Sequence, residues 1–105
     1  MPDRSVVAIG GPDRVKFLQG VMTNDIRQLA ADRTLYAGLL TGRGKLLYDV
    51  FLIQDGERIL IDIAANAAAD FIKRLTAFRI REAVEIAETA TRIPVRVRKR
   101  VKTKE

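Results

Sequence analysis

Apolar positions along the chain follow two different spacings, and these predict where strands and helices lie. Five short segments have the apolar runs or the two-residue alternation of strands: Ser5–Ile9, Leu35–Leu40, Leu46–Ile53, Arg58–Ala64 and Ala83–Glu88. Two further segments have the spacing of helices. One begins at Pro12, and the other carries Phe71, Leu75 and Phe78 on one face.

Turn sequences join the three middle strands. Residues 41–45, TGRGK, separate two apolar runs as a hairpin loop does, and Asp55-Gly56 marks the next turn. The order along the chain is therefore strand, helix, three-strand meander, helix, strand. This order predicts an α+β fold in which an antiparallel sheet carries its helices on one face.

The composition limits the chemistry that the chain can perform. Its 105 residues are 48% apolar, which is enough for the core of one small domain. The absence of Cys and His excludes disulfides and thiol nucleophiles and removes the commonest metal ligands, so we expect no metal bound by this chain. No apolar run reaches the roughly 20 residues of a membrane span, and the first residues do not read as a secretory signal.

The net charge of +6 lies entirely at the end of the sequence. Residues 1–90 hold twelve basic and twelve acidic residues, whereas residues 91–105 hold seven basic residues and Glu105. We therefore expect a neutral domain over 1–90 and a basic tail over 91–105 that is disordered or not native to the fold. A polyanion-binding arm is the alternative, but the aromatic residues lie in predicted core or helix positions and give it no stacking platform.

Asp49 is the first candidate site residue because it interrupts an apolar strand. Its predicted face also carries Leu47, Phe51 and Ile53, and the opposite face is equally apolar. We therefore expect Asp49 to lack a route to bulk water except through a pocket. Two outcomes remain open: an ion pair or backbone hydrogen bond that fixes the hairpin, or an acid that faces a ligand.

The predicted hairpin register adds Tyr36 to this site. A two-residue or four-residue loop makes paired positions sum to 85, so Tyr36 falls directly opposite Asp49. A phenol beside an acid suits a flat heterocycle, which stacks on the ring while the acid accepts a hydrogen bond from its nitrogen. The alternative is that Tyr36 only packs. Asp62, on a face that already carries Arg58, is predicted to be solvated.

Three blocks of sequence resemble the folate-binding aminomethyltransferase-like family, which includes the glycine-cleavage T-protein and relatives that mature iron–sulfur proteins. The blocks are GPDRVKFLQG at 11–20 with TNDI at 23–26, the hairpin sequence at 36–50, and FRIR at 78–81. They cover residues 6–88 in the family's order. Family members are several hundred residues long, so the resemblance implies an N-terminal segment of such a protein.

The resemblance implies roles for a few positions only. Asp49 matches the catalytic acid at the tetrahydrofolate nitrogen where the one-carbon unit is transferred, and Tyr36 matches an aromatic residue against the folate. Tyr48 stands where the T-protein has a second acid, as in the branch that assists iron–sulfur proteins. Ile53 stands where another folate-contacting aromatic residue is expected, which disfavours transferase activity.

The function implied is that of a tetrahydrofolate-binding factor for iron–sulfur cluster assembly and insertion into target proteins. Its partners would be folate and iron–sulfur proteins or their assembly machinery, without a membrane. Independent catalysis by this segment is not expected. The alternatives are an aminomethyltransferase of the glycine-cleavage type and a small basic nucleic-acid-binding module. The expected location is cytoplasmic in a bacterium and the mitochondrial matrix in a eukaryote.

Overall fold

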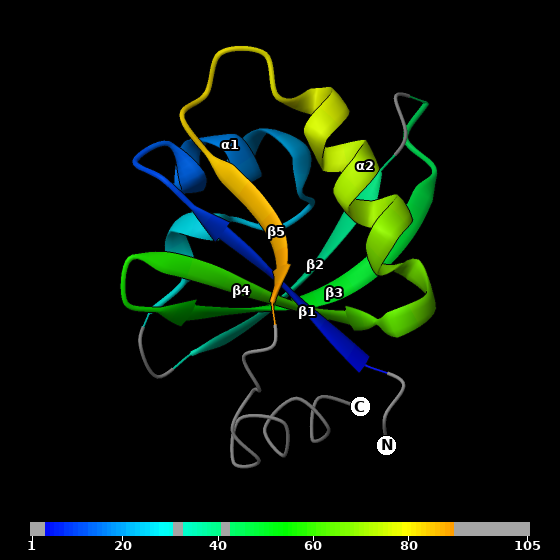
Figure 1. Ribbon diagram of the computed structural model, residues 1–105, viewed down its shortest axis with the longest axis horizontal. Coiled ribbons are helices and arrows are strands. Elements are labelled where there is room, and N and C mark those ends of the chain that lie inside the picture. Colours follow the sequence, from blue (N-terminus) through cyan, green and yellow to red (C-terminus); the bar gives the residue numbers. More distant parts are fainter. Residues whose placement is uncertain (1–3, 31–32, 41–42, 90–105) are drawn as a thin grey trace.

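A computed structural model describes residues 4–30, 33–40 and 43–89 (Figure 1). These residues form five strands: β1 (Arg4–Gly10), β2 (Thr34–Leu40), β3 (Leu46–Asp55), β4 (Arg58–Ala64) and β5 (Glu85–Thr89). They also form the helices α1 (Arg14–Val21) and α2 (Ala68–Phe78) and the 3₁₀ turns η1 (Ile26–Gln28) and η2 (Ala65–Ala67). The element order predicted from the sequence is confirmed.

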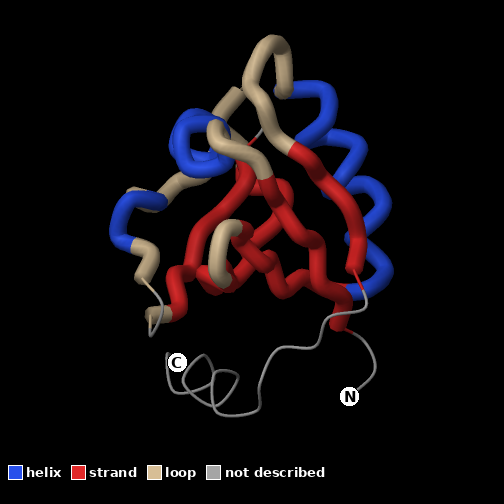
Figure 2. Tube along the Cα trace, turned by 60° about the vertical axis from the view of Figure 1, so that its left-hand side comes forward, coloured by secondary structure: helices blue, strands red, loops and turns tan. Residues whose placement is uncertain are grey.

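The five strands make one antiparallel sheet in the order β2-β3-β4-β1-β5. The meander β2-β3-β4 forms one half of the sheet, and β1 pairs with β4 on one side and β5 on the other. In Figure 2 the helices α1 and α2 lie apart from each other, with the strands between and below them. The α+β prediction is therefore confirmed.

Both helices pack on the same face of the sheet. The buried residues of α1 (Phe17 and Leu18) and of α2 (Phe71 and Leu75) belong to one apolar cluster with the inward side chains of four strands. Burying each large side chain contributes roughly 1.5–3 kcal/mol. A smaller cluster on the opposite face consists of Val6, Ile53 and Leu60, with Ala8 packed against it.

The outer edge of β2 is covered by the segment that follows α1. The Thr23 amide donates to the Gly38 carbonyl at 3.0 Å, and the Thr23 hydroxyl oxygen accepts from the Gly38 amide at 2.8 Å. The Asn24 side chain donates to the Tyr36 carbonyl at 2.9 Å. These bonds occupy backbone groups that an edge strand otherwise exposes, and they hold the backbone of Tyr36 in place.

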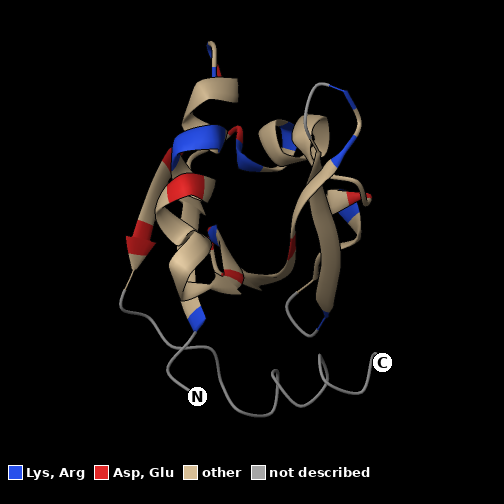
Figure 3. Ribbon diagram, turned by 90° about the vertical axis from the view of Figure 1, so that its right-hand side faces the viewer, with Lys and Arg blue, Asp and Glu red and all other residues tan. Residues whose placement is uncertain are grey.

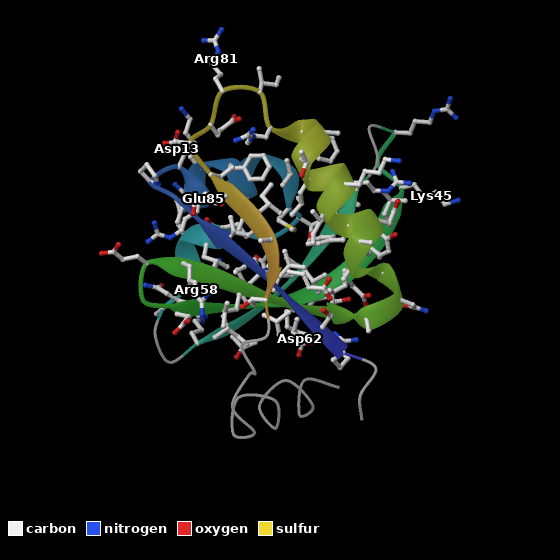
Figure 4. All side chains as sticks on the ribbon, viewed as in Figure 1. Asp13, Lys45, Arg58, Asp62, Arg81 and Glu85 are labelled. Atoms are coloured by element: carbon white, nitrogen blue, oxygen red, sulfur yellow. The ribbon has the colours of Figure 1, made fainter. Side chains whose placement is uncertain are left out.

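The prediction that Asp62 is solvated is wrong. Asp62 is only 4% exposed, because β4 is the central strand and the Asp62 Cα is paired with Phe51 on one side and Val6 on the other. Arg4 compensates the buried charge: its Nε donates to Asp62 Oδ1 at 3.0 Å, and its Nη2 donates to the Asp62 carbonyl at 3.2 Å. Figure 4 shows Asp62 beside β1.

The predicted domain boundary at residue 90 and the basic tail at 91–105 lie outside the described residues. Both therefore stay predictions. Of the helices that the structure describes, none is long and apolar enough to cross a membrane.

Candidate functional site

Tyr36 and Asp49 are brought together on the β2–β3 hairpin. The Tyr36 hydroxyl donates a hydrogen bond to Asp49 Oδ2 at 2.8 Å. Both side chains point to the sheet face opposite the helices, because Ala37 and Val50, their neighbours in sequence, point into the main core. The predicted proximity of the phenol and the acid is therefore present in the structure.

The register that led to this pairing is wrong. Tyr36 lies opposite Phe51, and Asp49 lies opposite Gly38, so paired positions sum to 87 over most of the hairpin. The cause is a five-residue connection between Leu40 and Leu46 with a register shift beside Leu39. Tyr36 reaches Asp49 along the diagonal, a separation that aromatic side chains can span.

The expected burial of Asp49 is also wrong. Asp49 is exposed, because β3 pairs with β4 only from Phe51 to Asp55. The first half of β3 therefore has β2 as its paired neighbour, and Leu46 at its start is 54% exposed. Apolar residues on both faces do not bury a strand where the sheet is only two strands wide.

Phe51 is a third member of the site. Its position on the strand predicted that it shares a face with Asp49, but predicted no role for it. Its ring centroid lies 5.1 Å from that of Tyr36, with the planes tilted by 52°. Tyr36 is 37% exposed and Phe51 is partly exposed, so the two rings form an accessible aromatic surface beside a carboxylate. The signal for Phe51 was its two-residue spacing from Asp49.

The charge of Asp49 acts on Tyr36. The hydrogen bond to Asp49 raises the pKa of the Tyr36 phenol above its ordinary value, since ionising the phenol would place two negative charges together. Among the described residues no cation lies within salt-bridge distance of Asp49. The ion pair considered from the sequence is therefore not found there.

Basic and acidic residues are interspersed over the molecule (Figure 3).

Tyr48 points to the other face of the hairpin and is tied to α2. Its hydroxyl donates to Asp70, which also accepts from Arg74 at 2.8 Å, and its ring packs edge-on against Phe71 at 6.0 Å. The two bonds lower the pKa of Asp70, the Tyr48 bond most, and the same bond raises the pKa of Tyr48. Tyr48, which stands where the resemblance to the T-protein implies a second acid, therefore has its hydrogen-bond partner on α2 and away from Asp49.

Ile53 and a cavity lined by described residues both lie apart from the Tyr36–Asp49 pair. Ile53, which stands where an aromatic residue was expected, is buried in the smaller apolar cluster rather than beside Asp49. A cavity of about 270 Å³ is present, but Tyr36 and Asp49 do not line it. Among the described residues no three acidic side chains gather as metal ligands would.

Comparison with known proteins identifies relatives of the chain. It is 32% identical over 104 residues to "Iron-sulfur cluster assembly factor IBA57 homolog, mitochondrial" of Mycosarcoma maydis, a match that covers 87% of this chain and 26% of that protein. It is 40% identical over 57 residues to "tRNA-modifying protein YgfZ" of Serratia proteamaculans, covering 54% of this chain and 17% of that protein. No protein-family model matches the chain.

A solved structure shares the fold. The aminomethyltransferase T of the glycine cleavage system from Bartonella henselae superposes with a TM-score of 0.75 at 23% identity, over 82% of this chain and 24% of that one. The chain therefore has a T-protein-like fold. Within that fold it belongs to the branch of the IBA57 homologues and YgfZ, and it spans about a quarter of the length of the first relative.

Proposed function

We propose that the chain is part of a tetrahydrofolate-binding factor that assists the assembly of iron–sulfur clusters and their insertion into target proteins. The observation that carries the proposal is the exposed Tyr36–Asp49 pair with Phe51 beside it. The names of the IBA57 relatives and membership of their branch support the cluster-assembly part. The partners proposed are iron–sulfur proteins or their assembly machinery.

The three side chains fit one edge and one face of a reduced pterin. The Tyr36 and Phe51 rings offer an apolar surface for a flat ring, and Asp49 offers an acceptor for a ring N–H. Bound tetrahydrofolate would supply a carrier for one-carbon units. The three side chains form only one side of a pocket, because the rings lie on an open face of the sheet and no described residue covers them.

The Tyr36 hydroxyl orients the acid in this arrangement. Its bond occupies Asp49 Oδ2 and, among the described contacts, leaves Oδ1 open to a donor on the ligand. The resemblance to the T-protein implies a catalytic role for Asp49. In this chain we propose that Asp49 binds and orients the folate.

Calorimetric titration of the chain with tetrahydrofolate tests the proposal. Tyr36→Ala removes half of the aromatic surface, and Asp49→Asn replaces an acceptor that carries a charge with a neutral amide. We expect each substitution to weaken binding about 2-fold to 100-fold, since a stacked ring contributes roughly 0.5–1.5 kcal/mol and a hydrogen bond to a charged group roughly 1.5–3 kcal/mol. Binding that survives both substitutions undiminished would remove the basis for the site.

Asp55→Asn is the matched control for Asp49→Asn. Asp55 is an exposed aspartate at the far end of the same strand, where it pairs with Arg58. Its substitution changes the net charge equally but leaves the aromatic surface intact. We expect the affinity for tetrahydrofolate to stay within about twofold of the unsubstituted chain, as for surface changes in general.

The alternatives have less support. Aminomethyl transfer of the glycine-cleavage type is disfavoured because Tyr48 and Ile53 replace residues that the resemblance to the T-protein associates with it. A nucleic-acid-binding module depends on the basic residues of 91–105, which lie outside the described part of the chain. The location that fits the relatives is the mitochondrion for a eukaryotic protein or the cytoplasm for a bacterial one.

A further inference from the structure

A cavity lies where α1 and η1 meet the β3–β4 hairpin. The cavity there has a volume of about 270 Å³, close to the lower limit of ordinary ligand pockets. Its lining is mainly aliphatic, with two arginines and one amide: Val15, Ile26, Leu29, Ile59, Arg14, Arg27 and Gln54. Gln54 is five residues after Asp49 on β3, roughly 17 Å along an extended strand, so the cavity is separate from the proposed folate site.

The two arginines at this cavity differ in their partners. Arg27 donates to both oxygens of Asp25, from Nε at 2.9 Å and from Nη2 at 3.1 Å, so its charge is compensated. Arg14 is half-buried, and its Nη1 donates to the Gly11 carbonyl at 3.0 Å. In the described part of the chain no carboxylate lies within salt-bridge distance of Arg14. Counted over the described residues alone, the cavity therefore has one positive charge, on Arg14, without a carboxylate in salt-bridge contact.

The lining determines which ligand would fit. A guanidinium forms bidentate hydrogen bonds with a carboxylate or a phosphate, and a single cation matches the single charge of a carboxylate; the Gln54 amide can donate to the same group. The aliphatic floor favours a short branched hydrocarbon chain over an aromatic ring, because none of the described lining residues is aromatic. A single uncompensated cation and a small volume are poorly suited to a nucleotide, which carries several charges and a large base.

We propose that this cavity binds a carboxylate carried on a short aliphatic group, with Arg14 as the anchor for the carboxylate. The hydrocarbon chain lies against Val15, Leu29 and Ile59. The ligand is a free short-chain acid or the carboxyl end of a peptide with an aliphatic last residue. The proposal does not depend on folate binding.

Titration of the full 105-residue chain with 4-methylpentanoate, followed by ¹H–¹⁵N NMR, tests the proposal without any substitution. The expected result is a millimolar dissociation constant, with shifts at the amides of Val15, Leu29 and Gln54 and none at Tyr36 or Asp49. The uncharged analogue 4-methylpentanamide should bind at least about tenfold more weakly, since hydrogen bonds to charged groups are the stronger ones. Equal binding of acid and amide, or shifts spread over the surface, would overturn the proposal.

A series of acids then tests the aliphatic floor. Each added methylene from acetate to 4-methylpentanoate should tighten binding roughly fourfold until the floor is covered. An affinity independent of chain length would mean that the acid is only a counter-ion of Arg14, and the proposal would be wrong. N-acetylleucine carries the same carboxylate and branched chain in a peptide-like form. Tighter binding of N-acetylleucine than of 4-methylpentanoate would point to the carboxyl end of a peptide as the ligand, and weaker binding would point to a free acid.

Arg14→Gln provides the matched test of the anchor. We expect this substitution to weaken the binding of 4-methylpentanoate at least about tenfold. The affinity for 4-methylpentanamide, which is lower from the start, should change by less than about twofold. Arg81→Gln removes the same charge from the loop before β5, where the side chain extends away from the body (Figure 4), and should have no effect. Equal losses in the two variants would show a general charge effect and contradict the proposal.

Discussion

Tyr36 donates a hydrogen bond to Asp49 across a diagonal of the β2–β3 hairpin, although the two residues are not a backbone pair. The contact therefore does not follow from strand pairing, and it depends on the rotamer that the phenol adopts. Phe51 lies against the Tyr36 ring with the two ring centroids 5.1 Å apart, and this contact is compatible with that rotamer. Because the acid is exposed rather than buried, the pair is accessible to a ligand.

The first prediction concerns the ionisation of Tyr36. Asp49→Asn removes the charge that the phenolate would meet, so the raised pKa of Tyr36 should fall toward its ordinary value. The chain has two tyrosines, and a Tyr48→Phe background makes Tyr36 the single phenol in an ultraviolet pH titration. Asp55→Asn should leave the Tyr36 titration unchanged. An unchanged pKa in Asp49→Asn would show that the bond does not form in solution.

Local patterns predicted the fold because each element follows from its own residues. The alternation of Ile59, Ile61 and Ile63 places one face of β4 in the core, and the glycine-rich segment at 41–45 separates β2 from β3. The exact hairpin register did not follow. It depends on one extra loop residue and a shift beside Leu39, which the composition of the loop does not specify.

The errors at Asp49 and Asp62 have a common physical origin. Burial of a strand residue depends on how many strands flank it, and the sequence of the strand itself does not contain that information. Asp49 is exposed because the pairing of β3 with β4 begins only at Phe51, and Asp62 is buried because β4 is central. The sequence shows that both carboxylates stand within strands, but only the strand order shows which one is accessible.

The second prediction concerns the ion pair of Arg4 with Asp62. Arg4→Gln should lower the free energy of unfolding by about 1–3 kcal/mol, because it leaves a carboxylate that is 4% exposed without its charged donor. Urea denaturation followed by circular dichroism measures the change. Arg58→Gln is the control, because its pair with Asp55 is exposed and should contribute less than about 1 kcal/mol. Equal costs would mean that Asp62 finds other compensation.

The third prediction concerns acid stability and Asp70. The pKa of Asp70 is lower in the folded state than in the unfolded chain, where it is about 4. The ionised carboxylate therefore stabilises the fold fully at any pH above the pKa of the unfolded state. This stabilisation is lost as the pH falls through the lower folded value. Asp70→Asn should therefore flatten the fall in unfolding free energy below about pH 4, measured by urea denaturation at a series of pH values.

The partners of Asp70 provide an internal control for that experiment. The bond from Tyr48 lowers the Asp70 pKa more than the bond from Arg74 does. Tyr48→Phe should therefore flatten the acid dependence more than Arg74→Gln. The opposite order would indicate that Arg74 is the main partner of Asp70 in solution and that the Tyr48 hydroxyl is bound elsewhere.

The fourth prediction compares alanine at three glycines that differ in their surroundings. Gly20 lies in α1 with open space around it, so Gly20→Ala should stabilise the chain by up to about 1 kcal/mol. Gly44 has a φ of 85° but open space, so Gly44→Ala should cost about 1–2 kcal/mol through backbone strain alone. Gly11 has a φ of 101°, and its added Cβ would lie 2.3 Å from the Ala83 carbonyl oxygen.

Gly11→Ala should therefore cost more than Gly44→Ala, because the substitution adds a clash to the strain. The clash cannot be relieved by a side-chain rotation, since the atom it meets is backbone. The turn after β1 is also held against this segment by Asp13, whose carboxylate accepts from the Ala83 amide at 2.8 Å and whose amide donates to the Ala83 carbonyl at 3.2 Å. Urea denaturation of the three variants checks the order, and a Gly11→Ala variant no less stable than Gly44→Ala would show that this contact opens in solution.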